Sequence, residues 1–133
     1  MENPEALEGL ALQVKLALES ADLSAYAELL DPDVRWGPPG DPSPPCQNRG
    51  QVMAWYQRGK SAGTRASVTE VTVIGDRLLV GLLVMGARDA RPQSRLSSRW
   101  QVLTVSDGRI NDIVGFESRE EAESYVAVAD SPQ

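Results

Sequence analysis

The chain has 133 residues and a mass of 14.4 kDa, which fits one domain that folds without a disulfide or a structural metal. It contains no histidine and one cysteine, Cys46, which excludes Ser-His-Asp and Cys-His triads, histidine metal sites and an intramolecular disulfide. The net charge of −6 argues against nucleic acid and anionic membranes as partners.

Basic residues gather in the middle of the chain. Residues 34–110 hold eleven basic and five acidic side chains, whereas both flanking segments are acidic. The pattern is typical of solvated faces, and the alternative is a basic segment that faces an acidic ligand. No apolar run is long enough to span a membrane, and the acidic start lacks the basic region of a signal peptide. With the lone cysteine, these features predict a cytoplasmic protein.

The N-terminal third predicts two helices and a strand. Residues 5–19 carry apolar side chains at the spacing of one helical face. A second short helix should end at Asp31-Pro32, because proline disfavours helix at the residue before it. Residues 33–36 then predict a short strand. The apolar stripe of the second helix is formed by Leu23, Tyr26, Ala27 and Leu30.

A proline-rich segment follows over residues 37–47. Its five prolines forbid a helix or a central strand, and the 36 residues before it are too few for a domain. We therefore predict an ordered crossover loop rather than a linker between domains. Asn48 should then cap a helix over residues 49–60.

The second half of the chain predicts an antiparallel arrangement of strands and a last helix. Gly75-Asp76 and Ser106-Asp107-Gly108 are the turn signals between paired strands. A polar loop is expected over residues 87–94, a capping box over 118–121 opens the last helix, and residues 129–133 form a tail. The four predicted strands cover residues 66–74, 77–86, 95–105 and 109–117.

The predicted strand that contains residues 78–85 is apolar on both faces. Such a strand is expected in the middle of a sheet that is covered on both sides. The helices should form one cover, and the other is either a second subunit or a folded-over edge. We predict a homodimer through the outer sheet face, and an isolated chain that exposes Leu82, Val84 or their neighbours.

The order of the elements resembles the nuclear-transport-factor-2-like superfamily, most closely its SnoaL-like and ketosteroid-isomerase-like members. The segments that carry the resemblance are LLDPDVRW, NRGQVMAWY and VLTVSDGRINDIVGF. It covers residues 5–128 and implies a single α+β domain of the cystatin-like type. In this fold a curved, mixed or antiparallel sheet wraps around helices and forms a cone with one apolar pocket. An open α+β sandwich without a cavity is the alternative.

The resemblance also locates the family's catalytic positions, one residue at a time. The base of ketosteroid isomerase corresponds to Pro38, its oxyanion-hole tyrosine to Val14 and its second oxyanion donor to Gln101. A tyrosine of the pocket wall is retained as Tyr56. The catalytic set of limonene epoxide hydrolase, a related enzyme, corresponds to Leu83, Met85 and Gly115. Both known catalytic sets are therefore broken, so neither activity is inferred.

Four polar side chains are the candidates for the chemistry of the pocket, and the fourth, Asp112, depends on the register of the last hairpin. The resemblance directs Gln101 into the pocket, where its amide can donate to a carbonyl or oxyanion or can bridge backbone groups. Arg99 lies on the same strand face and can anchor a carboxylate or form a salt bridge at the rim. Glu117 is the preferred general base. The alternative interpretation is that Glu117 is an ordinary residue just before a helix N-terminus.

The register of the last hairpin decides which acid faces the pocket. A two-residue turn at Asp107-Gly108 pairs Gln101 with Val114 and places Asp112, the second candidate base, on the same face. A three-residue loop with a glycine bulge pairs Gln101 with Ile113, so that Gly115 and Glu117 face inward and Asp112 faces out. The resemblance favours the bulged form.

The remaining pocket wall should be apolar and aromatic, which suits an apolar ligand with one polar group. Two functions remain open. One is a cofactor-independent isomerase, cyclase or dehydratase that acts on an apolar, oxygen-bearing substrate without a metal. The other is a non-catalytic ligand-binding or accessory protein. The predicted wall residues are Trp36, Trp55, Tyr56, Met85, Leu103 and Ile113.

Overall fold

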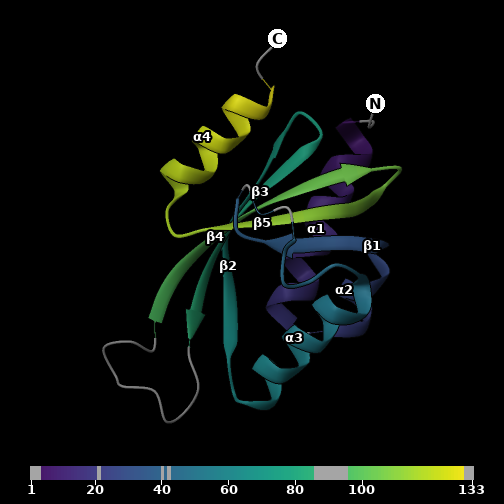
Figure 1. Ribbon diagram of the computed structural model, residues 1–133, viewed down its shortest axis with the longest axis vertical. Coiled ribbons are helices and arrows are strands. Elements are labelled where there is room, and N and C mark those ends of the chain that lie inside the picture. Colours follow the sequence, from purple (N-terminus) through teal and green to yellow (C-terminus); the bar gives the residue numbers. More distant parts are fainter. Residues whose placement is uncertain (1–3, 21, 40, 42, 86–95, 131–133) are drawn as a thin grey trace.

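The computed structural model describes residues 4–20, 22–39, 41, 43–85 and 96–130, with side chains described except at 4, 96–97 and 128–130. The elements follow the predicted order (Figure 1). The polar loop predicted over 87–94 and the end of the predicted tail lie outside the described residues. The elements are α1 (Pro4–Ser20), α2 (Leu23–Glu28), β1 (Leu30–Gly37), α3 (Arg49–Ser61), β2 (Arg65–Ile74), β3 (Arg77–Met85), β4 (Leu96–Ser106), β5 (Arg109–Phe116) and α4 (Arg119–Asp130).

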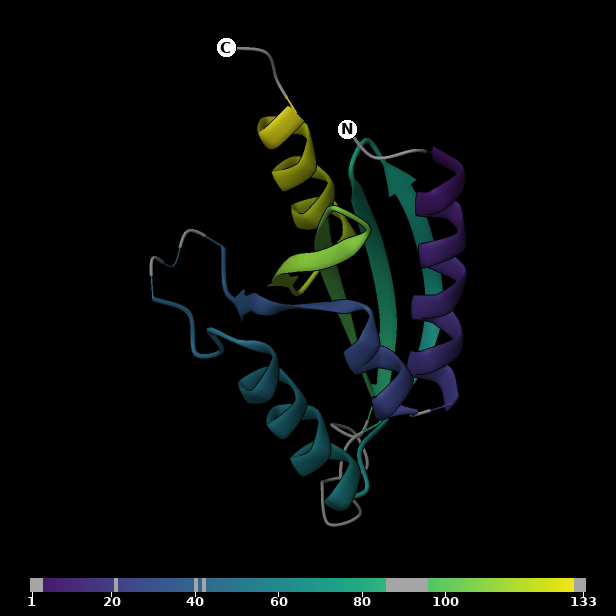
Figure 2. The same ribbon diagram turned by 90° about the vertical axis from the view of Figure 1, so that its right-hand side faces the viewer.

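The five strands form one curved, unclosed sheet in the order β1-β5-β4-β3-β2. β1 runs parallel to β5, and the other neighbours are antiparallel. The sheet is therefore mixed and the protein is α+β, as predicted. α1 lies along one side of the sheet and α4 on the other, and the start of α1 and the end of α4 lie at the same end of the molecule (Figures 1 and 2).

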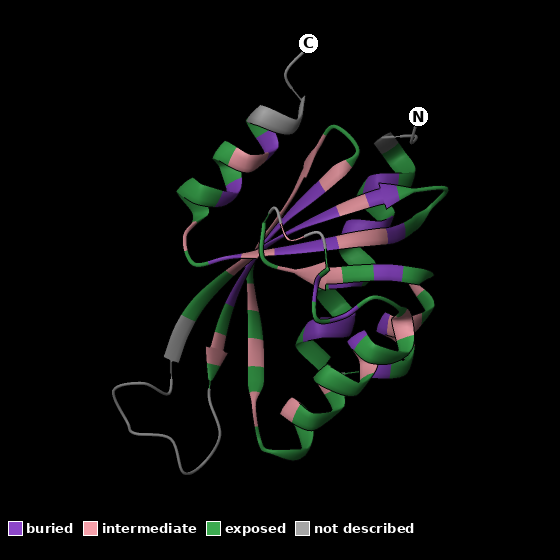
Figure 3. Cartoon of the chain, viewed as in Figure 1, coloured by how far each residue is buried: buried purple, intermediate pink, exposed green. Residues whose placement is uncertain are grey.

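Helices cover both faces of the sheet. On the face that we call inner, Leu78 and Val80 of β3 share one apolar core with α1, α2 and α3. On the opposite, outer face, Leu79 of β3 packs in a second cluster with Ala122 and Val126 of α4. Buried residues accordingly run along the middle strands (Figure 3). At Leu79 the second cover of β3 is thus a helix of the same chain, which is neither of the two covers that the sequence suggested.

The boundary between α2 and β1 differs from the prediction. α2 ends at Glu28, and β1 already begins at Leu30 rather than at residue 33. Leu30 leaves the helix because it pairs with Ile110 of β5, whose backbone N–H donates to the carbonyl of Leu29 at 2.9 Å. Pro32 is compatible with β1 because β1 is an edge strand.

The proline-rich segment folds back on β1 as the predicted ordered loop. Trp36 and Cys46 form an isolated antiparallel bridge with N···O distances of 2.9 and 3.2 Å. Pro44 packs so closely on Gly37 that a Cβ there would lie 2.5 Å from the Cβ of Pro44. Asn48 caps α3 as predicted, because its side chain accepts from the N–H of Gln51.

The last hairpin follows neither predicted register. Asp107 and Gly108 have φ values of +54° and +77°, so they form the two-residue turn that the Asp-Gly pair favours. A bulge then adds one residue to β5 between Ile110 and Asp112, and Gln101 pairs with Gly115. The pairings with Val114 and Ile113 are wrong, because both predicted registers placed any irregularity in the turn and not in the strand.

Candidate functional site

Three polar side chains from three elements converge inside the inner core. Tyr26 comes from α2, Tyr56 from α3 and Gln101 from β4, and we call them the Tyr-Gln cluster. The two tyrosine rings meet edge to face with centroids 5.3 Å apart. Gln101 is only 6% exposed, although its neighbours on the inner face are apolar. The cluster is thus a polar spot in an apolar interior.

Local sequence patterns direct the two tyrosines inward. Asp22 caps α2 by accepting from the N–H of Ala25, which fixes the helix with Tyr26 against the core. Tyr56 lies one turn after the fully buried Val52 on α3, so the two share a helix face. The sequence pattern placed Tyr26 only in the apolar stripe of the second helix. Its hydroxyl was the feature that could have marked it as a candidate for the site.

Three polar atoms of the cluster have no hydrogen-bond partner among the described residues. The hydroxyls of Tyr26 and Tyr56 and the Oε1 of Gln101 are buried, and none is paired with another of the described residues. The three side chains lie close enough to one another to change the pKa values of the two tyrosines. Each unpaired buried group costs about 1–3 kcal/mol. A folded protein normally offsets this cost with an ordered water or a bound ligand at such a place.

The tyrosines act as neutral donors near pH 7. Burial raises the pKa of Tyr26, and the neighbouring Tyr56 adds to the rise. Burial also raises the pKa of Tyr56, while the polar ends of Gln101 and Tyr26 offset part of that rise. A hydroxyl that stays protonated can donate to a ligand oxygen, but it cannot serve as a base at this pH.

Aromatic side chains form one wall of the cluster. The rings of Trp36 and Tyr56 stack with centroids 5.0 Å apart and an interplanar angle of 20°. Trp55 meets Trp36 edge to face at 6.1 Å, but it is 53% exposed and lies under the guanidinium of Arg58. Trp36 and Tyr56 therefore lie where a pocket wall was predicted, whereas Trp55 faces mainly solvent.

Two predicted wall residues lie with the cluster and one does not. Leu103 and Ile113 are fully buried in the inner core, on the sheet face of Gln101. Met85 is 48% exposed and shares the outer face with Leu79, because alternate residues of β3 point to the same side. Met85 was wrongly expected in the pocket.

Two predicted polar candidates lie outside the cluster. Arg99 is exposed near the beginning of β4, where one of its guanidinium nitrogens lies 3.5 Å from the carbonyl of Ser98. Glu117 follows the last residue of β5 and is exposed. A carboxylate in solvent lacks the apolar surroundings that the pocket was expected to give a general base.

Asp112 lies on the outer face, as the bulged alternative expected. It is half-buried in a pocket of about 200 Å³ with Arg35 of β1 and Tyr125 of α4. Burial raises the pKa of Asp112, and the charges of Arg35 and Arg77 oppose the rise. Because Gln101 belongs to the opposite face, the sheet separates this carboxylate from the Tyr-Gln cluster.

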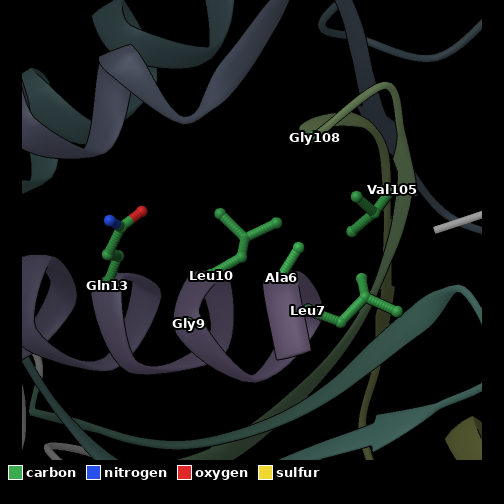
Figure 4. Close-up of a pocket in the computed structure, with 7 residues that line it drawn as sticks. All are labelled: Ala6, Leu7, Gly9, Leu10, Gln13, Val105 and Gly108. Carbon is green, nitrogen blue, oxygen red and sulfur yellow. The ribbon is translucent and has the colours of Figure 1, made fainter. Parts of the chain in front are cut away.

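A further pocket of about 190 Å³ lies between α1 and the turn that joins β4 to β5. Figure 4 shows Leu10 and Gln13 of α1 on one side and Val105 and Gly108 on the other. Its lining includes no member of the cluster. Within the described parts of the chain, no group of three or more acidic or cysteine side chains could hold a metal ion. No helix there is long and apolar enough to cross a membrane.

Comparison with known proteins agrees with this architecture. A cystatin-fold protein from Novosphingobium aromaticivorans superimposes with a TM-score of 0.69 at 13% identity, over 84% of this chain and 97% of that one. The fold is thus cystatin-like, of the nuclear-transport-factor-2-like kind. The sequence model of the SnoaL-like domain matches residues 13–113, so the chain belongs to the SnoaL-like domain family.

Two further solved structures are similar in fold. A candidate polyketide cyclase from Xanthomonas campestris has a TM-score of 0.69 at 20% identity, over 94% of this chain and 99% of that chain. A candidate ketosteroid isomerase from Kribbella flavida has the same TM-score and identity, over 86% and 79%. At this identity the likeness concerns the fold alone. The sequence matches no curated protein at a significant level.

Proposed function

We propose that this protein binds a small, uncharged and largely apolar molecule that carries an oxygen atom, at the Tyr-Gln cluster. The observation that carries the proposal is the convergence of three buried oxygens, from Tyr26, Tyr56 and Gln101, that have no partner in the described part of the chain and lie in an apolar core. A ligand oxygen would accept from the tyrosine hydroxyls, a donor on the ligand would bind the Oε1 of Gln101, and the core would hold the apolar remainder. A charged ligand fits poorly, because no described side chain of the cluster carries an opposite charge.

Binding without turnover is the function that this geometry favours. Isomerisation or dehydration needs a group that removes a proton, and the cluster contains only neutral side chains near pH 7. Asp112 lies on the opposite sheet face, and Glu117 lies in solvent. The second candidate is a cofactor-independent isomerase, cyclase or dehydratase. In its favour, two protonated tyrosines and an amide resemble an oxyanion hole, and candidate enzymes of these classes share the fold.

Calorimetric titration with phenol tests the binding site, using protein that was unfolded and refolded to remove any ligand carried from the cells. Replacement of Tyr56→Phe or Gln101→Leu should weaken binding by about 1–3 kcal/mol, the cost of one unpaired group. Tyr125→Phe is the matched control, because that residue belongs to α4 on the outer face and should leave the affinity unchanged. Equal affinities in all variants would remove the cluster as the site.

Proton exchange separates the two candidate functions. A β,γ-unsaturated ketone incubated in D₂O should exchange its acidic protons at the same rate with and without the protein. Faster exchange that Asp112→Asn or Glu117→Gln abolishes would support the enzyme and contradict a binding protein.

We also propose that the protein is a cytoplasmic homodimer. The lone Cys46 is buried, which agrees with a protein that makes no disulfide. Leu83 and Met85, neighbours of Leu82 and Val84, are 38% and 48% exposed on the outer face beyond α4. A second copy could cover them. A sedimentation mass near 14.4 kDa at micromolar concentration would contradict the dimer.

A further inference from the structure

Gly115 occupies the position directly opposite Gln101. The two residues pair across β4 and β5, and Ile113, two residues earlier on β5, lies in the inner core. A side chain at position 115 would therefore project to the inner face, beside Gln101. A Cβ built there meets one described atom at the limit of contact, the indole Nε1 of Trp36 at 4.0 Å, and nothing closer. Gly115 is itself half-buried rather than enclosed.

Neither the backbone nor the packing explains a glycine at this position. The described glycines with positive φ are Gly63, Gly75 and Gly108, so the backbone of Gly115 suits any residue. Glycine is unfavourable within a strand, because it gains no packing and loses more entropy on folding. At Gly81, by contrast, a Cβ would lie 2.5 Å from the ring of Trp100. Protein atoms exclude a side chain at Gly81, but at Gly115 the space is left open.

Two complementary hydrogen-bonding groups border this space. The Oε1 of Gln101 is an acceptor to which none of the described residues donates. The indole N–H of Trp36 can only donate, and the described contacts of that side chain are with aromatic rings and the apolar core. A hydroxyl can donate to the first group and accept from the second. A ketone or an ether can only accept, and a carboxylate would bring an unpaired charge into the apolar core.

We infer that Gly115 determines the specificity of the site, by leaving room beside Gln101 and Trp36 for the hydroxyl of a neutral alcohol, phenol or enol. The inference rests on the proposed binding function and adds the ligand class and the residue that admits it. It predicts that substitutions at position 115 change stability and ligand affinity in opposite directions, which a purely structural glycine would not show. A larger residue at position 115 leaves the fold as stable or more stable, but it weakens binding.

The test combines three probes with variants of one position. Phenol, anisole and benzoate share a ring and differ in whether the polar group donates, only accepts or is charged. Their binding is followed by ¹⁵N–¹H spectra, in which the indole signal of Trp36 reports the site and that of Trp100, on the outer face, is an internal control. Phenol should bind at least tenfold more tightly than anisole or benzoate and should shift the Trp36 signal.

Gly115→Ala should weaken phenol binding at least threefold and Gly115→Val at least tenfold, while the melting temperature stays equal or rises. Gly9→Ala is the matched control, because a Cβ there meets nothing within 4 Å and α1 gains stability without a change in binding. If Gly115→Val does not fold, Gly115→Ala decides by the same criterion.

The test distinguishes a failure of the inference about Gly115 from a failure of the proposed binding function. Wild-type affinity in the Gly115 variants, or anisole binding as tightly as phenol, overturns the inference and leaves the binding function standing. A wild-type protein in which no probe shifts the Trp36 signal overturns both.

Discussion

Replacement of Gln101 by leucine separates stability from binding. The two side chains have similar size, and Gln101 is 6% exposed, so leucine should fit the same space in the inner core. The change removes an amide whose Oε1 has no partner among the described residues. The desolvation penalty of such a group is about 1–3 kcal/mol, and removing it should stabilise the ligand-free protein. Loosened packing around Tyr56 offsets part of this gain.

We therefore expect the free energy of unfolding of Gln101→Leu to rise by about 1 kcal/mol, which corresponds to a shift in melting temperature of about 3–5 °C. Urea unfolding of the refolded, ligand-free protein measures it, as a higher midpoint with an unchanged m-value. Gln57→Leu makes the same chemical change at an exposed position of α3 and should alter stability by less than about 0.5 kcal/mol.

A loss of stability of more than about 1 kcal/mol in Gln101→Leu would refute the reasoning, because it would mean that the native protein already satisfies this amide. The same variant must bind phenol more weakly than the wild type. Weaker binding without a loss of stability would show that the amide is kept at a cost to the fold for the sake of a ligand.

Three other measurements test the structure. The free energy of unfolding should fall as the pH rises above about 10, because the folded state holds the protons of the two cluster tyrosines more tightly than the unfolded chain. A double Tyr26→Phe/Tyr56→Phe variant should lose this part of the slope, and an unchanged slope would contradict their burial. The guanidinium of Arg119 donates to Glu70 at 2.7 and 2.8 Å and, with Thr72, lowers the pKa of Glu70 from 4.5 to about 2. The ionised Glu70 therefore stabilises the folded state above pH 4.5, and this stabilisation is lost as the pH falls toward 2. Glu70→Gln should reduce the dependence of stability on pH in this range, measured by circular dichroism during acid unfolding. At pH 7 it should lower the free energy of unfolding by about 1 kcal/mol or less. Gly81→Ala should lower the free energy of unfolding in urea by about 1–3 kcal/mol, since its Cβ would lie 2.5 Å from the ring of Trp100, and a neutral result would contradict that close approach.

Much of the fold could be predicted because its signals are local. Apolar spacing predicted α1, Asn48 and the capping box over 118–121 marked helix starts, and Gly75-Asp76 marked a hairpin. The prolines of residues 37–47 excluded regular structure whatever surrounded them. These signals depend on backbone geometry and on neighbours along the chain, so the sequence alone determined the element order and, through its resemblance, the family.

The tertiary structure decided the contacts between elements. A bulge at one residue of β5 changed the partner of Gln101 and placed Gly115 beside it, and no turn signal predicts an extra residue inside a strand. The packing of α4 supplied the outer cover of β3, which an apolar pattern alone cannot distinguish from a second subunit. Tyr26 joined the site only because α2 and α3 bring two hydroxyls from distant positions together. Periodicity determines which face of an element is buried, whereas the long-range packing of the whole chain determines what that face meets.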